Sequence, residues 1–239
     1  SRGIGLVSID GQITKGESSF GGTSSTRTRH ALRSAAADHD VKAIMLHIDS
    51  PGGTVAGLQP LADEVYAIAQ SGKLIHTHAD DMMASAALWV GIQANHVTAS
   101  AMTEVGSIGV VAMVQDTSGA AEQAGVKVHV ISTGEHKGAF APGAEVTDDH
   151  LAELQSRVDE INTFFAAAVK RGAGLSIEAV RSLADGRDWL AAEAKDKGLI
   201  DGVATFDDAM MALHRQVRNQ EREVESASRS RRIAMAKLT

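Results

Sequence analysis

Cysteine is absent from the 239-residue chain, and Phe, Trp and Tyr together make up only 3% of it. Without cysteine there can be no disulfide, no thiolate zinc site, no iron–sulfur cluster and no cysteine nucleophile. A hydroxyl is therefore the leading candidate for any covalent chemistry. The net charge of −7 and the scarcity of aromatic side chains argue against a nucleic-acid binder, which needs basic surfaces and stacking platforms.

Long apolar runs are also missing. A membrane-spanning helix needs about 18 or more consecutive apolar residues, and no segment of the chain approaches that length. The first residues, Ser1-Arg2-Gly3, do not have the pattern of a signal peptide. We therefore expect a soluble protein without a membrane partner.

The residues that are present alternate between short β-branched runs and longer Ala-rich amphipathic stretches, which predicts a layered α/β fold. The run at 43–48 is almost entirely apolar and is expected to be a central strand covered on both faces. The other expected strands are 5–9, 73–78, 96–99, 105–114 and 127–131. The expected helices are 28–38, 58–69, 84–94, 119–124, 147–171, 176–184, 191–197 and 207–214, with Thr147 and Ser176 as N-caps.

The composition changes near residue 214. Residues 215–239 contain seven basic and three acidic side chains, so this segment carries a charge of +4 and leaves −11 for the rest. We predict a body at 1–214 and a basic tail at 215–239. The tail is interpreted either as a solvated terminal helix or frayed end, or as a linker or partner-binding arm.

Three segments have the residue types that acyl chemistry requires. Gly52 and Gly53 follow the predicted central strand and leave backbone N–H groups open to a ligand, as an oxyanion site needs, although such a turn also serves purely structural roles. Ser85 lies among small residues at a predicted helix start, where it is either a nucleophile or an N-cap. No histidine has surroundings that mark it as a base. A lysine can be the base when burial leaves it as a free amine, and Lys137 lies in a glycine-flanked loop.

The order of five short motifs resembles the signal peptide peptidase A family of Ser-Lys proteases. The motifs are Asp49-Ser50-Pro51-Gly52-Gly53, Ala84-Ser85-Ala86-Ala87, Val105-Gly106-Ser107-Ile108-Gly109-Val110, Gly134-Glu135-His136-Lys137, and Asp185-Gly186-Arg187 with Gly198-Leu199-Ile200-Asp201. The sequence around Ser85 is more similar to the bacteriophage branch, the capsid assembly or prohead proteases. The resemblance covers roughly residues 3–203.

The resemblance implies a role for each matched residue. Ser85 would be the nucleophile and Lys137 the general base, with Ser107 holding the lysine amine. The N–H groups of Gly53 and Ala86, helped by that of Gly52, would stabilise the oxyanion. Ala86-Ala87 stand where many bacterial members carry glycine or an aromatic residue, so the substrate pocket should differ in shape.

The family resemblance also implies the Clp protease/crotonase-like fold of repeated β-β-α units and a homo-oligomeric ring with sites at subunit interfaces. Scaffold or capsid proteins, and the chain's own tail, would be the polypeptide substrates during phage head maturation, in the host cytoplasm within assembling proheads. The tail at 215–239 would lead toward a scaffold segment.

Other classes remain open at this point. A crotonase-like acyl-CoA enzyme also uses glycine-flanked N–H groups, but it would normally use a Glu or Asp base. An idle assembly or scaffold subunit would not need Ser85, Ser107 and Lys137 together, and a Clp-type triad lacks a histidine at a matching place. No metal or other cofactor is predicted, because His76 and His78 share a strand face without a third ligand and no P-loop is present.

Overall fold

The computed structural model describes residues 3–17, 19 and 21–236, and it divides into two compact units. Unit 1 consists of residues 1–108 and 166–239, and unit 2 of residues 109–165. The end of the predicted tail, residues 237–239 with Lys237, lies outside the described residues. No helix in the described part of the chain is long and apolar enough to cross a membrane.

Unit 1 is built on a mostly parallel sheet. Its strands are β1 (Ile4–Asp10), β4 (Ala43–Ser50), β5 (Leu74–Ala84), β6 (His96–Ala99), β7 (Glu104–Gly106), β8 (Asp188–Leu190) and β9 (Gly202–Val203). The main order is β1-β4-β5-β6-β9, and β7 pairs with the later part of β5 and with β8. Only the β7–β8 pair is antiparallel. The predicted α/β class is confirmed.

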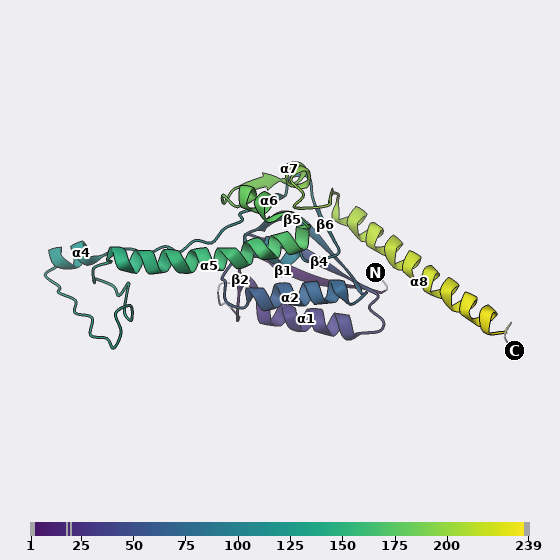
Figure 1. Ribbon diagram of the computed structural model, residues 1–239, viewed down its shortest axis with the longest axis horizontal. Coiled ribbons are helices and arrows are strands. Elements are labelled where there is room, and N and C mark those ends of the chain that lie inside the picture. Colours follow the sequence, from purple (N-terminus) through teal and green to yellow (C-terminus); the bar gives the residue numbers. More distant parts are fainter. Residues whose placement is uncertain (1–2, 18, 20, 237–239) are drawn as a thin grey trace. The chain divides into compact units, whose positions relative to one another are not determined.

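Helices cover both faces of this sheet. On one face, α1 (Ser25–Ala37) and α2 (Leu58–Gln70) lie side by side (Figure 1), and Ile44, Leu46 and Ile48 of β4 are fully buried. On the other face, Ala43 and Met45 pack against one side of α8 (Phe206–Ala236). The predicted central strand is therefore correct, because each face of β4 meets a helix layer.

The remaining elements of unit 1 are short. β2 (Ile13–Thr14) and β3 (Thr23–Ser24) form a two-stranded parallel pair. The other helices are α3 (Ala86–Gly91), α6 (Ile177–Leu183) and α7 (Ala191–Asp196). The Ser176 hydroxyl accepts a hydrogen bond from the Ala179 N–H at 3.1 Å, which confirms the predicted N-cap of α6. The helix expected at 84–94 is shorter than predicted because β5 extends to Ala84.

Unit 2 contains α4 (Ser118–Gln123) and the first part of α5 (Asp148–Ala173), whose last residues, from Ala166, belong to unit 1. The predicted helix at 147–171 is confirmed, and the Thr147 hydroxyl accepts from the His150 N–H at 3.3 Å.

Two predicted strands of this region are wrong. Of the expected strand 105–114 only Val105 and Gly106 lie in the sheet, as part of β7, and 127–131 forms no strand. The β-branched residues there, such as Val111 and Ile131, remain 81% and 97% exposed. A strand needs a neighbour to complete its hydrogen bonds, and no described segment pairs with 109–114 or 127–131.

The C-terminal helix is longer than predicted. The expected helix 207–214 continues without a break as α8 to Ala236. Its first turns bury Ala209, Leu213 and Val217 against the sheet, whereas residues from Arg218 to Arg231 are exposed. The charged part is thus a helical extension of the body, and the boundary between 1–214 and 215–239 stays a prediction.

Candidate active site

Ser85 lies at a sharp turn where β5 ends and α3 begins. Its backbone has φ 51° and ψ −120°, a conformation that L-residues other than glycine rarely adopt. Two hydrogen bonds hold this turn: the Ser85 N–H donates to the Gly106 carbonyl at 2.9 Å, and the Ser85 carbonyl accepts from the Trp89 N–H at 3.0 Å. The Ser85 side chain makes no N-cap hydrogen bond to α3. The strained backbone is typical of a functional serine rather than a capping one.

The turn that follows β4 approaches Ser85 closely. Gly52 has φ +101°, and a Cβ atom placed on it would lie 2.8 Å from the Ser85 Cβ and 2.9 Å from the Ala86 nitrogen. Only glycine fits at this point, because any side chain would collide with the serine turn. The Ser50 hydroxyl supports the arrangement by donating to the Gly11 carbonyl at 2.6 Å and accepting from the Gly52 N–H at 3.2 Å.

Gly53 is fixed by the segment around β2. The Ile13 N–H donates to the Gly52 carbonyl at 2.8 Å, and the Thr54 N–H donates to the Ile13 carbonyl at 2.9 Å. A Cβ atom on Gly53 would overlap the Ile13 carbonyl oxygen. Among the described residues, no hydrogen bond uses the Gly53 N–H, and Gly53 is exposed. Ala86 is the first residue of α3, so its N–H also has no partner within the helix.

Ser107 is the neighbour of Ser85 across the sheet. Ala84 of β5 pairs with Gly106 of β7 in parallel register, so the two serines directly follow a paired position. Ser107 also has a positive φ of 54°. Its N–H donates to the Arg187 carbonyl at 2.8 Å, which gives a structural role to the motif Asp185-Gly186-Arg187.

β8, which begins directly after Arg187, adds a perturbed acid. Asp188 of β8 pairs with Gly106 in the antiparallel register. Burial, followed by the negative charge of Glu104, raises the pKa of Asp188 above its ordinary value. Asp188 thus pairs with the residue before Ser107, a proximity that no sequence pattern indicates.

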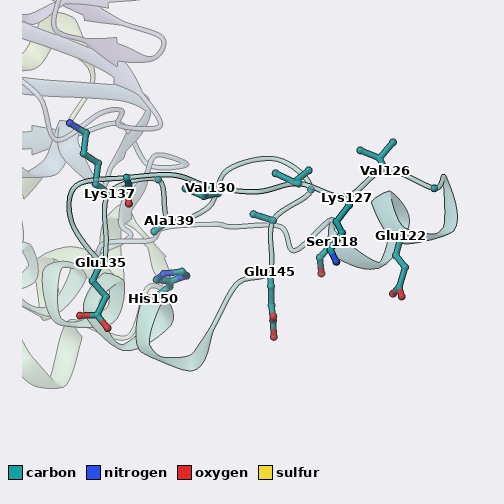
Figure 2. Close-up of a pocket in the computed structure, with 16 residues that line it drawn as sticks. Ser118, Glu122, Val126, Lys127, Val130, Glu135, Lys137, Ala139, Glu145 and His150 are labelled. Carbon is teal, nitrogen blue, oxygen red and sulfur yellow. The ribbon is translucent and has the colours of Figure 1, made fainter.

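Lys137 belongs to unit 2, whereas the other five predicted site residues belong to unit 1. It lies in a series of turns, where its N–H donates to the Gly134 carbonyl at 3.1 Å and Gly138 follows with φ +98°. The side chain is exposed and lines a cavity of about 610 Å³ within unit 2. In Figure 2 the side chains of Lys137 and Glu135 point to opposite sides of this loop. The other charged or titratable residues around the cavity are Glu122, Lys127, Glu145 and His150.

Two histidines on neighbouring strands of unit 1 have structural partners. His76 Nε2 lies 2.9 Å from Gln216 Oε1, and His96 Nδ1 lies 3.2 Å from Asp201. Burial, followed by the nearby charge of His96, lowers the pKa of His76 to about 4. Within the described part of the chain, no group of three or more His, Asp or Glu side chains is arranged to hold a metal ion.

Comparison with known proteins gives a consistent family. The model of peptidase family S49 matches residues 67–220. Protease 4 of Haemophilus influenzae is 30% identical over 210 residues, which cover 87% of this chain and 34% of that protein. Capsid assembly protease C of Escherichia phage lambda is 33% identical over 182 residues, covering 76% and 41%. Head-tail preconnector protein GP5 of Enterobacteria phage P21 is 32% identical over 190 residues, covering 76% and 36%.

The chain thus spans only about a third to two-fifths of the length of these relatives. The family match contains Ser85, Ser107 and Lys137, and the Clp protease/crotonase-like fold agrees with the parallel sheet. With more than half of its length matched, the chain belongs to peptidase family S49.

Proposed function

We propose that the protein is a serine endopeptidase in which Ser85 is the nucleophile and Lys137 the general base. The observation that carries this proposal is the strained turn at Ser85. The Gly52 backbone lies so close to this turn that there is no room for a Cβ atom, and Ser107 lies beside Ser85 in the strand register. Membership of a peptidase family supports the same reaction class. A crotonase-like acyl-CoA activity is less well supported, because such a reaction does not require a serine in this strained turn.

The proposed reaction uses the groups at the Ser85 turn together with Lys137. The Lys137 amine takes the Ser85 proton as Oγ attacks a peptide carbonyl, and it then returns the proton to the leaving nitrogen. The N–H group of Gly53, which no hydrogen bond among the described residues uses, and that of Ala86, at the first position of α3, stabilise the oxyanion of the tetrahedral intermediate, with Gly52 shaping the space between them. Water then hydrolyses the acyl-enzyme. Ser107 orients the lysine amine by hydrogen bonding.

We also propose that the active form is a homo-oligomeric ring in which Ser85 and Lys137 of one site come from neighbouring subunits. Unit 2 supports this proposal, because it exposes large apolar side chains that a monomer would leave in water. Within segments 109–114 and 126–131 the most exposed are Val111, Met113, Val126, Val130 and Ile131. Segments 109–114 and 126–131 have strand-like composition and lack a sheet partner, which a second copy would provide.

The substrates that we propose are scaffold or capsid proteins cleaved during phage head maturation, and the chain's own tail at 215–239. The support is the name of two relatives, a capsid assembly protease and a head-tail preconnector protein. On this proposal 1–214 is the protease domain, and the helical tail leads toward a scaffold segment.

The dyad is tested with Ser85→Ala and Lys137→Ala, assayed on a fluorescently labelled unfolded protein. Each variant should lose essentially all cleavage while keeping its assembly state in size-exclusion chromatography. Lys127→Ala is the matched control, because Lys127 is another exposed lysine of the same cavity, and it should stay active. Undiminished proteolysis by either dyad variant would refute the assignment.

Mixing the two inactive variants tests the shared site. If serine and lysine come from different subunits, random co-assembly restores about a quarter of the sites, since each group is intact in half of the chains. If both come from one chain, every site of the mixture lacks one group and no activity returns. A mixture that remains inactive after subunit exchange would refute the shared site and leave the dyad itself untouched.

A further inference from the structure

β5 contains an irregularity just before the predicted nucleophile. Its pairing with β4 is regular up to Ile48 and Ala79, but the next pair joins Ser50 to Met83. Three residues of β5 (80–82) therefore stand opposite Asp49 alone. A bulge of this kind re-aims the residues that follow it and often lies next to an active site. We call residues 80–82 the β5 bulge.

β5 also changes its other partner at the bulge. Residues 76–79 pair with β6, and residues 82–84 pair with β7. The second pairing sets Ser85 beside Ser107, so the path of the chain through the bulge decides where Ser85 lies. The backbone pairing of β5 with β4 and with β6 does not fix that path, because neither strand pairs with residues 80 and 81.

Asp80 is the residue that ties the bulge to its surroundings. Its carboxylate accepts from His47 Nε2 of β4 at 2.6 Å and from the Ser100 hydroxyl at 3.1 Å, while His78 Nε2 lies 3.4 Å away. Burial alone would raise the pKa of Asp80, but the hydrogen bonds from His47 and Ser100 hold it below its ordinary value. The group is thus an ionised acceptor that connects β4, β5 and the end of β6.

The two histidines are themselves held in place. His78 is fully buried, and its Nδ1 lies 2.9 Å from the Thr98 hydroxyl, which in turn lies 3.3 Å from the Thr77 carbonyl oxygen. The Phe206 ring of α8 lies edge-on against both imidazoles, with centroids 5.1 Å from His47 and 5.7 Å from His78. A carboxylate bound to such immobile partners is itself immobile.

Thr103 holds the backbone at the start of the bulge. It is fully buried, and its hydroxyl contacts the carbonyl oxygens of Ala79, at 3.1 Å, and of Asp80. The side chain of Asp80 and the backbone at the start of the bulge are therefore fixed by separate contacts. By contrast Asp81, the next carboxylate, is exposed and forms no side-chain hydrogen bond or ion pair with any of the described residues.

We infer that Asp80 is a positioning residue for Ser85, acting through the β5 bulge, with Thr103 as the second support. The inference rests on the proposed role of Ser85 as nucleophile. Asp80 does not touch the reacting atoms. It restrains the path of β5 so that the serine turn meets Ser107 and the Gly52 backbone in the geometry described above.

The test compares Asp80→Ala, Asp80→Asn and Asp81→Ala in the full-length chain, with kcat and KM measured on a labelled unfolded protein. Asp80→Ala should lower kcat roughly 10- to 100-fold, as a small misplacement of a reacting group does, while KM changes little. Asp80→Asn should restore most of the rate, since its amide oxygen can still accept from His47. Asp81→Ala should match the unmodified protein.

Several results would overturn the inference. They are a wild-type kcat in Asp80→Ala, an equal loss in Asp81→Ala, or a loss confined to KM. If circular dichroism shows that Asp80→Ala does not fold, Thr103→Val decides the matter, because a wild-type kcat in that variant contradicts the need for a restrained bulge. Ser85→Ala separates the two proposals: its full activity would refute the nucleophile, whereas an inactive Ser85→Ala beside a fully active Asp80→Ala refutes the positioning role alone.

Discussion

The buried histidine under α8 makes unit 1 sensitive to acid. His76 is 2% exposed, and burial, followed by the charge of His96, lowers its pKa from 6.5 to about 4. Between these values the unfolded chain binds a proton that the folded chain does not, so the free energy of unfolding falls as the pH is lowered below about 6.5. The loss of stability is therefore absent above about pH 6.5 and reaches its full size below about pH 4.

The size of the effect follows from the two pKa values. At pH 5 the lost stability is about 2 kcal/mol, and it approaches about 3.4 kcal/mol in stronger acid. His76→Gln removes the titrating group and should flatten the dependence by this amount, whatever its effect at neutral pH. His39→Gln, which changes an exposed histidine, is the control and should leave the dependence unchanged.

Urea unfolding at pH 7.5 and pH 5, followed by tryptophan fluorescence, measures this difference. The chain has two tryptophans, Trp89 and Trp189, and both are buried in unit 1, so the signal reports on that unit. His78 adds to the total in the unmodified protein, because its pKa is also lowered, chiefly by burial. An equal pH dependence in His76→Gln and the unmodified protein would refute the assignment.

Two further substitutions test local geometry. Gly52→Ala should lower activity by about 100-fold or more, because the new Cβ collides with the serine turn at the oxyanion site. The control is Gly72→Ala, since Gly72 also has a positive φ of +90° but faces open space, and this variant should retain full activity. Equal losses in the two variants would contradict the collision. Lys73→Met should lower the free energy of unfolding by about 1.5 to 3 kcal/mol in urea titrations. The reason is that the Lys73 ammonium donates to the Ala35, Ala36 and Asp38 carbonyls at the end of α1. An unchanged midpoint of the urea transition would show that these hydrogen bonds add no net stability.

The sequence predicts those elements whose partners are apolar and regular. β4 was predictable because its run of apolar residues matches a strand with a helix layer on each face, and α6 because Ser176 is a typical cap. Segments 109–114 and 127–131 have the same composition as strands, yet a strand also requires a neighbour, and local sequence does not contain that information. β8 has three residues, too few for a pattern. The charged part of α8 has no apolar stripe that would have indicated its length.

The site shows the same division. The proximity of Gly52, Ser85 and Ser107 could be predicted, the first two from the chemistry of their motifs and Ser107 through the family resemblance. The contacts that support them could not. The Arg187 carbonyl and the Asp80 carboxylate become relevant only through strand register, a long-range property that a single sequence does not display.

Sheet topology explains why five weak motifs form one specific signature. β4, β5 and β7 run parallel, so the segments after them meet at one edge of the sheet, the place where α/β proteins bind their ligands. The Gly52 turn, Ser85 and Ser107 follow these strands in that order, and the distances between them along the chain are set by the intervening helices and strands. Helices and loops can vary in length without moving the edge, but a shift in β5 register would move Ser85 away from both of its neighbours. The β5 bulge is where that register is set, and for that reason the support from Asp80 and Thr103 should be as sensitive to substitution as the turn itself.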